Sequence, residues 1–270
     1  MGPMLLNRLL LPAALFLTAC ASVPAEPPAH DLHAEVRGDG EPLIVFINGN
    51  GATLSVWDGI EAALREDGVT ALLTDRDGLG GTALGPRPYR IEDEIASLRA
   101  TIAKLPDGPQ EMILVAHSYG GLIAAGLADE ENVAGVVLVD ALVPGAMTQE
   151  LVEETLATYR PQYEAVRKQA PDVAAAIIPI VEAYPETADA VSGMAWPNGL
   201  TLIIIEAENP AGGPATQAAT RSAYRRLIAE NPGSRTLVIA ERSGHQVMRD
   251  RPDLVVEAIR SLIKEMRAEG

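Results

Sequence analysis

Short apolar runs recur along the chain and predict the strands of one sheet. The runs are rich in Val, Ile and Leu, and such continuous runs are typical of strands that are buried on both faces. They cover residues 43–47, 70–73, 112–116, 136–139, 200–205 and 236–240. Ahead of them, alternating apolar and polar positions over 32–36 predict a first strand, and the glycines of the turn at 38–40 favour a hairpin with the run that follows.

Helical patterns separate several of these runs. One apolar stripe steps by four, three, four and three residues through Ile91, Ile95, Leu98, Ile102 and Leu105. A final helix is expected from Pro252, with Val255, Ile259, Leu262 and Met266 facing inward. Alternating strands and helices predict an α/β fold with a mostly parallel, doubly wound sheet, in which ligands bind beyond the carboxyl ends of the strands.

The alternation stops between residues 140 and 200. Helical segments over about 148–190 are interrupted by Pro161, Pro171, Pro179 and Pro185. We interpret this stretch as a helical cap between the last-but-two and last-but-one strands. The predicted domains are a core of residues 31–143 and 200–270, and a cap of residues 144–199.

The first 30 residues differ from the rest. Arg8 precedes an apolar stretch, and the ending Leu17-Thr18-Ala19-Cys20 resembles a bacterial lipobox. The resemblance implies that residues 1–19 are a lipoprotein signal peptide and that Cys20 is lipidated, so that a membrane is a partner through the lipid. The alternatives are an ordinary secretory signal with an incidental thiol and an uncleaved anchor, for which the apolar run falls short of the ~20 residues needed.

Residues 20–30 are small and proline-rich, as expected for a tether between a lipid and a folded domain. The predicted location is therefore the bacterial cell envelope. Ala21 is not the aspartate associated with inner-membrane retention, which favours the outer membrane or the periplasmic face.

The charge balance excludes one class of partner. Lys and Arg number 21 against 37 Asp and Glu, which gives a net charge of −16 and disfavours nucleic acid. The sequence holds neither a metal-ligand cluster nor a phosphate-binding glycine loop followed by lysine, so we expect no cofactor and no metal.

A candidate nucleophile follows the third of the six apolar runs. Residues 112–121 lead from a strand into Ser118, with Ala116 two positions before it and Gly120 two positions after it. A sharp strand-to-helix turn requires small residues at these positions, which is the pattern of a nucleophile elbow. The alternative is that these residues form an ordinary turn at the end of a strand and have no catalytic role.

A serine nucleophile needs an imidazole base, and the chain has four histidines. His30 and His33 lie in or beside the tether, and His117 is expected to point away from its neighbour Ser118. His245 follows the last predicted strand, at the same sheet edge as the elbow, and is therefore the predicted base.

Three carboxylates compete to orient this histidine. Asp140 ends one predicted strand, and Glu206 and Glu208 follow the next; we favour Asp140 and keep Glu208 and Glu206 as alternatives. For the oxyanion we expect the backbone N–H groups of Tyr119 and Asn50.

Together these segments resemble the α/β-hydrolase fold family, over about Asp31–Arg267. The resemblance rests on Ile47-Asn48-Gly49-Asn50, Asp75-Arg76-Asp77-Gly78-Leu79-Gly80, Ala116-His117-Ser118-Tyr119-Gly120-Gly121 and Ser243-Gly244-His245. Asn48-Gly49 replaces the usual His-Gly, and Glu206-Ala207-Glu208-Asn209 replaces the customary Gly-x-x-Asp. Some members take their acid from the preceding strand, which favours Asp140.

The resemblance implies a serine hydrolase that cleaves a carboxylic ester of a small-molecule acyl substrate through an acyl-enzyme. Alternatives are an amide, lactone or thioester hydrolase with the same triad, and a non-catalytic ligand-binding scaffold in the cell envelope. Trp196 and Tyr184 either line the substrate pocket or only pack beside it.

Overall fold

The computed structural model describes residues 29–106 and 110–269. The predicted signal peptide, Cys20 and most of the predicted tether lie outside these residues. The strands are β1 (Ala34–Arg37), β2 (Leu43–Ile47), β3 (Thr70–Thr74), β4 (Met112–His117), β5 (Val133–Val139), β6 (Thr201–Asn209) and β7 (Arg235–Gly244). The six apolar runs are thus confirmed as strands. β6 and β7 extend further than the runs because they continue to pair with each other as far as Asn209 and Gly244.

The strands form one sheet in the order β1-β3-β2-β4-β5-β6-β7. Only β1 is antiparallel to its neighbour, so the predicted mostly parallel sheet is confirmed. The predicted hairpin is wrong, because β1 pairs with β3 and β3 separates it from β2. The turn at 38–40 crosses the start of β3, where a Cβ on Gly38 or Gly40 would overlap the backbone carbonyl of Val69 or Gly68.

Helices cover both faces of the sheet. They are α1 (Asp58–Leu64), α2 (Ile91–Ala103), α3 (Gly120–Ala125), α8 (Pro214–Glu230), α9 (Val247–Asp250) and α10 (Pro252–Glu269). One apolar core joins the sheet to α2, α3 and α8, and a second joins the opposite face to α1, α9 and α10. Odd and even positions of β2 divide between the two cores, which is why its sequence is apolar throughout.

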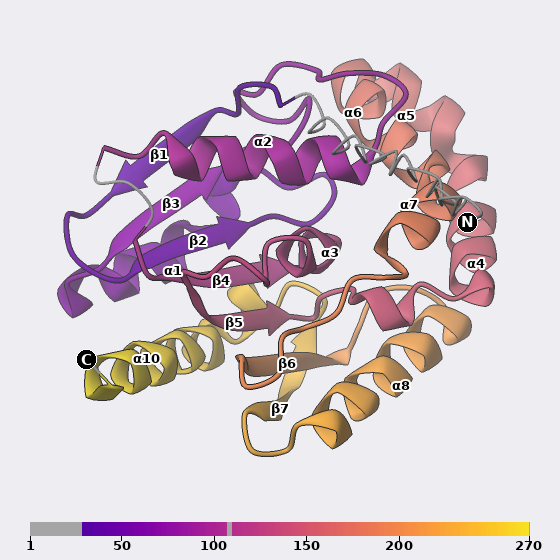
Figure 1. Ribbon diagram of the computed structural model, residues 1–270. Coiled ribbons are helices and arrows are strands. Elements are labelled where there is room, and N and C mark those ends of the chain that lie inside the picture. Colours follow the sequence, from indigo (N-terminus) through magenta and orange to yellow (C-terminus); the bar gives the residue numbers. More distant parts are fainter. Residues whose placement is uncertain (1–28, 107–109, 270) are drawn as a thin grey trace, which may run out of the picture.

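The predicted cap is a group of four helices between β5 and β6. They are α4 (Gln149–Tyr159), α5 (Tyr163–Gln169), α6 (Pro171–Glu182) and α7 (Tyr184–Val191). Three of the four prolines predicted to interrupt this stretch lie at helix starts or in the short turn between α4 and α5, whereas Pro179 lies inside α6. Figure 1 shows these helices gathered beyond the end of the sheet toward which β2 and β5 point. Among the described residues, no helix combines the length and the apolar character needed to cross a membrane.

Candidate active site

The chain bends sharply between β4 and α3, and Ser118 lies at the bend. Its φ is 54°, in the left-handed region that costs a non-glycine residue about 1–3 kcal/mol. Small neighbours are required here, because a Cβ on Gly120 would lie 2.6 Å from the carbonyl oxygen of Ile47. Ala116 is fully buried between β2 and β5. The local geometry is that of a nucleophile elbow.

We expect Gly120→Ala to destabilise the fold by about 1–3 kcal/mol, since the added methyl group must displace the backbone of β2. Urea unfolding of the variant measures this loss. Gly59→Ala in α1 is the matched control, because its Cβ meets nothing within 4 Å, and alanine there is expected to stabilise by about 0.5–1 kcal/mol. Equal stability of the two variants would contradict the tight packing at the elbow.

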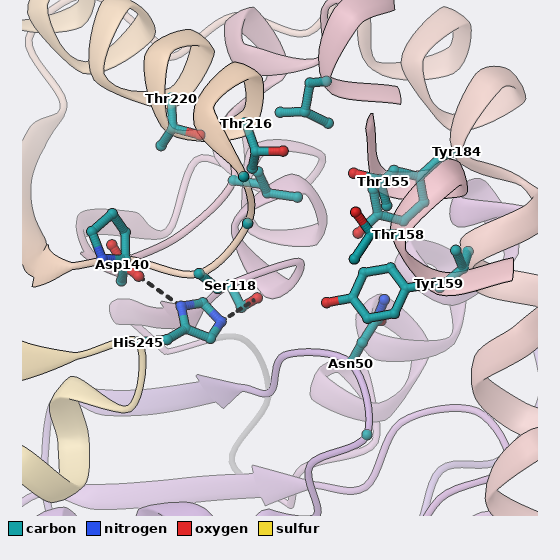
Figure 2. A pocket seen from close by; sticks show the side chains of 18 of the residues that line it. Asn50, Ser118, Asp140, Thr155, Thr158, Tyr159, Tyr184, Thr216, Thr220 and His245 are labelled. Atoms are coloured by element: carbon teal, nitrogen blue, oxygen red, sulfur yellow. Dashed lines mark hydrogen bonds and ion pairs between the residues drawn. The ribbon is translucent and has the colours of Figure 1, made fainter. Parts of the chain in front are cut away.

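Three of the sequence-predicted residues form one chain of hydrogen bonds (Figure 2). His245 Nε2 lies 3.0 Å from Ser118 Oγ, and His245 Nδ1 lies 2.6 Å from Asp140 Oδ2. A carboxylate only accepts hydrogen bonds, so Nδ1 carries the proton and Nε2 is left to accept from the serine hydroxyl. This tautomer is the one that a general base requires.

Asp140 is held rigidly at the end of β5. Its side chain is 3% exposed, and Oδ1 accepts the backbone N–H of Ala207 at 3.1 Å. Its φ of 41° is again left-handed. The chain therefore leaves the strand direction at Asp140, and the carboxylate faces His245.

The two alternative acids have other partners. Glu206 pairs with Arg221 at 2.6 Å, and Glu208 accepts the backbone N–H of Arg242 at 2.6 Å. Within the described chain neither carboxylate is hydrogen-bonded to His245. Glu208 instead holds the backbone at Arg242, in the segment that leads to His245. Arg242 has a left-handed φ of 60°.

The loop after β2 contacts Ser118 directly. A Cβ on Gly49 would lie 2.8 Å from the Ser118 Cβ, so only glycine allows this approach. Asn50 follows in the loop and lines the same cavity as Ser118 and His245. In the described residues, the backbone N–H groups of Asn50 and Tyr119 donate no internal hydrogen bond, which leaves both available to an oxyanion.

His117 has a place at the site that the sequence did not indicate. Its ring packs against the His245 ring, with centroids 4.5 Å apart, and its Nε2 lies 3.0 Å from the His245 carbonyl oxygen. Burial, and then repulsion from His245 when that ring is protonated, lowers the pKa of His117 to about 3. His117 is therefore neutral near pH 7, and its Nε2–H donates to the backbone carbonyl oxygen of His245. The expectation that it points away from Ser118 gave no hint of this contact.

A cavity of about 510 Å³ opens onto the three residues. Cap residues provide most of its apolar wall, namely Leu151, Val166, Ile177, Ile178, Val181 and Tyr184. Hydroxyl groups also line it, from Thr155, Thr158, Tyr159, Thr216 and Thr220, as Figure 2 shows for the labelled side chains. Arg221 is the only arginine among the described residues that line the cavity, and it is paired with Glu206.

The two aromatic candidates separate in the structure. Tyr184 lines this cavity, whereas Trp196 lines a different depression beside Arg235. Sequence reasoning missed the contribution of α8, although Pro214 at its first position is an ordinary helix-start signal. Within residues 29–106 and 110–269, no group of three His, Cys, Asp or Glu side chains could hold a metal ion.

Comparisons with known proteins give one consistent result. Residues 44–258 match the model of the alpha/beta hydrolase family. Similar solved structures include a carboxylesterase of the thaumarchaeon Nitrososphaera gargenis, with 16% identity, a TM-score of 0.66 and coverage of 87% of this chain and 96% of that one. No curated protein matches the chain.

Two further structures have the same fold at similar distance. A monoacylglycerol lipase of Paleococcus ferrophilus has 15% identity and a TM-score of 0.63, with coverage of 87% of this chain and 99% of that one. The enol-lactonase of Burkholderia xenovorans LB400 has 19% identity and a TM-score of 0.58, with coverage of 86% and 96%. At these identities the likeness concerns the fold.

Proposed function

The chain belongs to the alpha/beta hydrolase family, and from this premise we propose that it is a serine hydrolase that cleaves carboxylic esters through an acyl-enzyme. The observation that carries the proposal is the Asp140–His245–Ser118 chain of hydrogen bonds at the wall of a cavity. A fold alone does not fix a reaction. The arrangement of a nucleophile, a base and an orienting carboxylate supports acyl transfer.

Each residue has a defined step in the proposed reaction. Ser118 Oγ attacks the acyl carbon while its proton passes to His245 Nε2, and the backbone N–H groups of Asn50 and Tyr119 bind the resulting oxyanion. His245 then gives the proton to the leaving alcohol oxygen, which departs and leaves Ser118 acylated. Water repeats the sequence on the acyl-enzyme, and the carboxylic acid leaves with the serine restored. Asp140 stabilises the imidazolium in both halves.

The cavity wall supports an uncharged substrate. Two carboxylates, Asp140 and Glu206, line it, and Arg221 is engaged by Glu206. A carboxylate on the substrate would therefore meet no unpaired arginine or lysine among the described lining residues, which costs binding energy in a partly buried site. The apolar cap residues instead suit an aliphatic acyl or alcohol group.

The test combines an active-site probe with a matched substrate pair. We expect a fluorophosphonate to label the folded full-length chain, and 4-nitrophenyl butanoate to be hydrolysed at least about tenfold faster than the 4-nitrophenyl half-ester of succinate, a difference of ~1.4 kcal/mol. A panel of butanoyl amide, thioester and lactone substrates ranks the other bond classes. Folded protein without labelling or turnover would favour the non-catalytic scaffold, and faster turnover of another bond class would replace the ester.

We also propose that Cys20 carries a lipid and tethers the enzyme to the bacterial cell envelope. The support is the sequence of residues 1–20, with Arg8, the apolar stretch and the lipobox-like ending. Mass spectrometry of the membrane fraction tests this, with loss of the lipid-modified form in Cys20→Ala as the expected result.

A further inference from the structure

A buried ion pair lies beneath the loop that holds Asn50. Arg76, which follows β3, binds Glu94 of α2 through two hydrogen bonds of 2.6 and 2.7 Å, and both side chains are 3% exposed. Burial by itself raises the pKa of Glu94, but the charge and hydrogen bonds of Arg76 outweigh it and hold the pKa below its ordinary value. Both groups are therefore charged near neutral pH.

The same guanidinium contacts both residues assigned to the oxyanion hole. Its Nη1 donates to Asn50 Oδ1 at 2.8 Å, and the guanidinium carbon lies 4.8 Å from the centroid of the Tyr119 ring. A guanidinium has only donors, so the contact also fixes the Asn50 amide with its oxygen toward Arg76. The planar fork can serve Glu94 and Asn50 at once because its donors point in fixed directions.

The hydroxyl group of Tyr119 is also held in place by hydrogen bonds. Its hydroxyl lies 3.1 Å from the Tyr89 hydroxyl and 3.2 Å from Thr187 Oγ1 in α7, and Tyr89 donates to Glu94 at 2.6 Å. Glu94, Arg76, Tyr89 and Tyr119 thus close a ring of buried contacts. Asn50 leads from this ring to the cavity, and so does Tyr184, whose ring centroid lies 5.7 Å from that of Tyr119.

We propose that Arg76 is a positioning residue that sets the distance between the Asn50 and Tyr119 N–H groups and so shapes the oxyanion hole. The proposal rests on the function proposed above. Stability alone gives no reason for this pair, because a buried ion pair is commonly no better for stability than well-packed apolar side chains. The two N–H groups come from separate segments, the loop after β2 and the elbow after β4. The planar Arg76 guanidinium contacts both residues and so keeps the distance between them fixed.

Arg76→Lys and Asn50→Ala test the link from its two ends. Lysine keeps the positive charge beside Glu94 but lacks the planar guanidinium that donates to Glu94 and Asn50 at once. Alanine keeps the backbone N–H of residue 50 but removes the Oδ1 that accepts from Arg76. We expect each variant to lower kcat for 4-nitrophenyl butanoate by about tenfold to a hundredfold, below the 10²–10³ typical of losing a donor outright, with KM changed less than about threefold. The double variant should be no slower than the slower single variant.

A tetrahedral inhibitor separates positioning from general damage. The affinity for butaneboronic acid, whose anionic adduct on Ser118 occupies the oxyanion hole, should fall by the same factor as kcat in Arg76→Lys. Arg235→Lys is the control, because Arg235 is an equally buried arginine that binds Glu230 and the Trp196 carbonyl at the remote end of the sheet. It should lower the melting temperature without changing kcat or boronate affinity.

Three results would overturn the inference: unchanged kcat in Arg76→Lys, additive losses in the double variant, or loss of kcat without loss of boronate affinity. These outcomes differ from failure of the proposed function. In that case the unaltered chain itself would fail to react with the fluorophosphonate.

Discussion

Replacing Ser118 with alanine is expected to lower kcat/KM for 4-nitrophenyl butanoate by about 10⁴–10⁶, or ~5–8 kcal/mol of transition-state stabilisation. Alanine removes the Oγ that lies 3.0 Å from His245 Nε2 and leaves no atom to form the acyl-enzyme. Fluorophosphonate labelling should vanish together with turnover. The residual rate would come from binding and the oxyanion N–H groups alone.

Folding controls make this result specific to the nucleophile. Ser118→Ala should melt within a few degrees of the unaltered protein, because alanine retains the Cβ already accommodated at the elbow. Ser222→Ala, on the exposed side of α8, should keep both labelling and turnover. Persistent labelling of Ser118→Ala at an unchanged rate would assign the nucleophile elsewhere.

Asp140→Asn is expected to reduce kcat by on the order of 10³–10⁴ with little effect on the fold. Asparagine is nearly isosteric, tolerates the left-handed φ of 41°, and can still accept the Ala207 N–H. Its amide NH₂, however, would face His245 Nδ1 and favour the tautomer with the proton on Nε2, which cannot accept from Ser118. The measurement is kcat across the pH range, beside thermal melting of each variant.

Glu208→Gln and Glu206→Gln are the matched controls for the acid. Glutamine can still accept from the Arg242 N–H in the first variant and from Arg221 in the second. Since neither carboxylate is hydrogen-bonded to His245 in the described part of the chain, we expect kcat within about threefold of the unaltered protein. A folded Glu208→Gln protein without turnover, combined with an active Asp140→Asn, would reverse the assignment of the acid.

Much of the fold follows from local pattern. The continuous apolar runs predict strands because a strand covered on both faces can expose no polar side chain to either core. The stripe from Ile91 predicts α2, and Pro252 predicts the start of α10. The pairing of the first strand was not predicted correctly. The glycine turn at 38–40 resembles a hairpin turn between β1 and β2, but β3 lies between these two strands and pairs with β1.

Some residues of the candidate site can be predicted from the local sequence, and others cannot. Ser118 is predictable because the small residues around it answer a local steric demand, and His245 because only four histidines are available. The choice among Asp140, Glu206 and Glu208 needs distances between separate strands. So does the role of Arg76, whose contacts with Glu94 and Asn50 join residues 18 and 26 positions away.

By itself, the sequence determined the α/β architecture, the cap and the elbow, since each depends on periodicity or on steric demands between near neighbours. Only the tertiary structure decided the partner of β1, the carboxylate that faces His245, the packing of His117 and the buried Arg76 contacts. These features depend on the directions of side chains from different segments, where a rotation of one residue, such as the left-handed turn at Asp140, redirects a carboxylate. Residue types and spacing along the chain do not encode those directions.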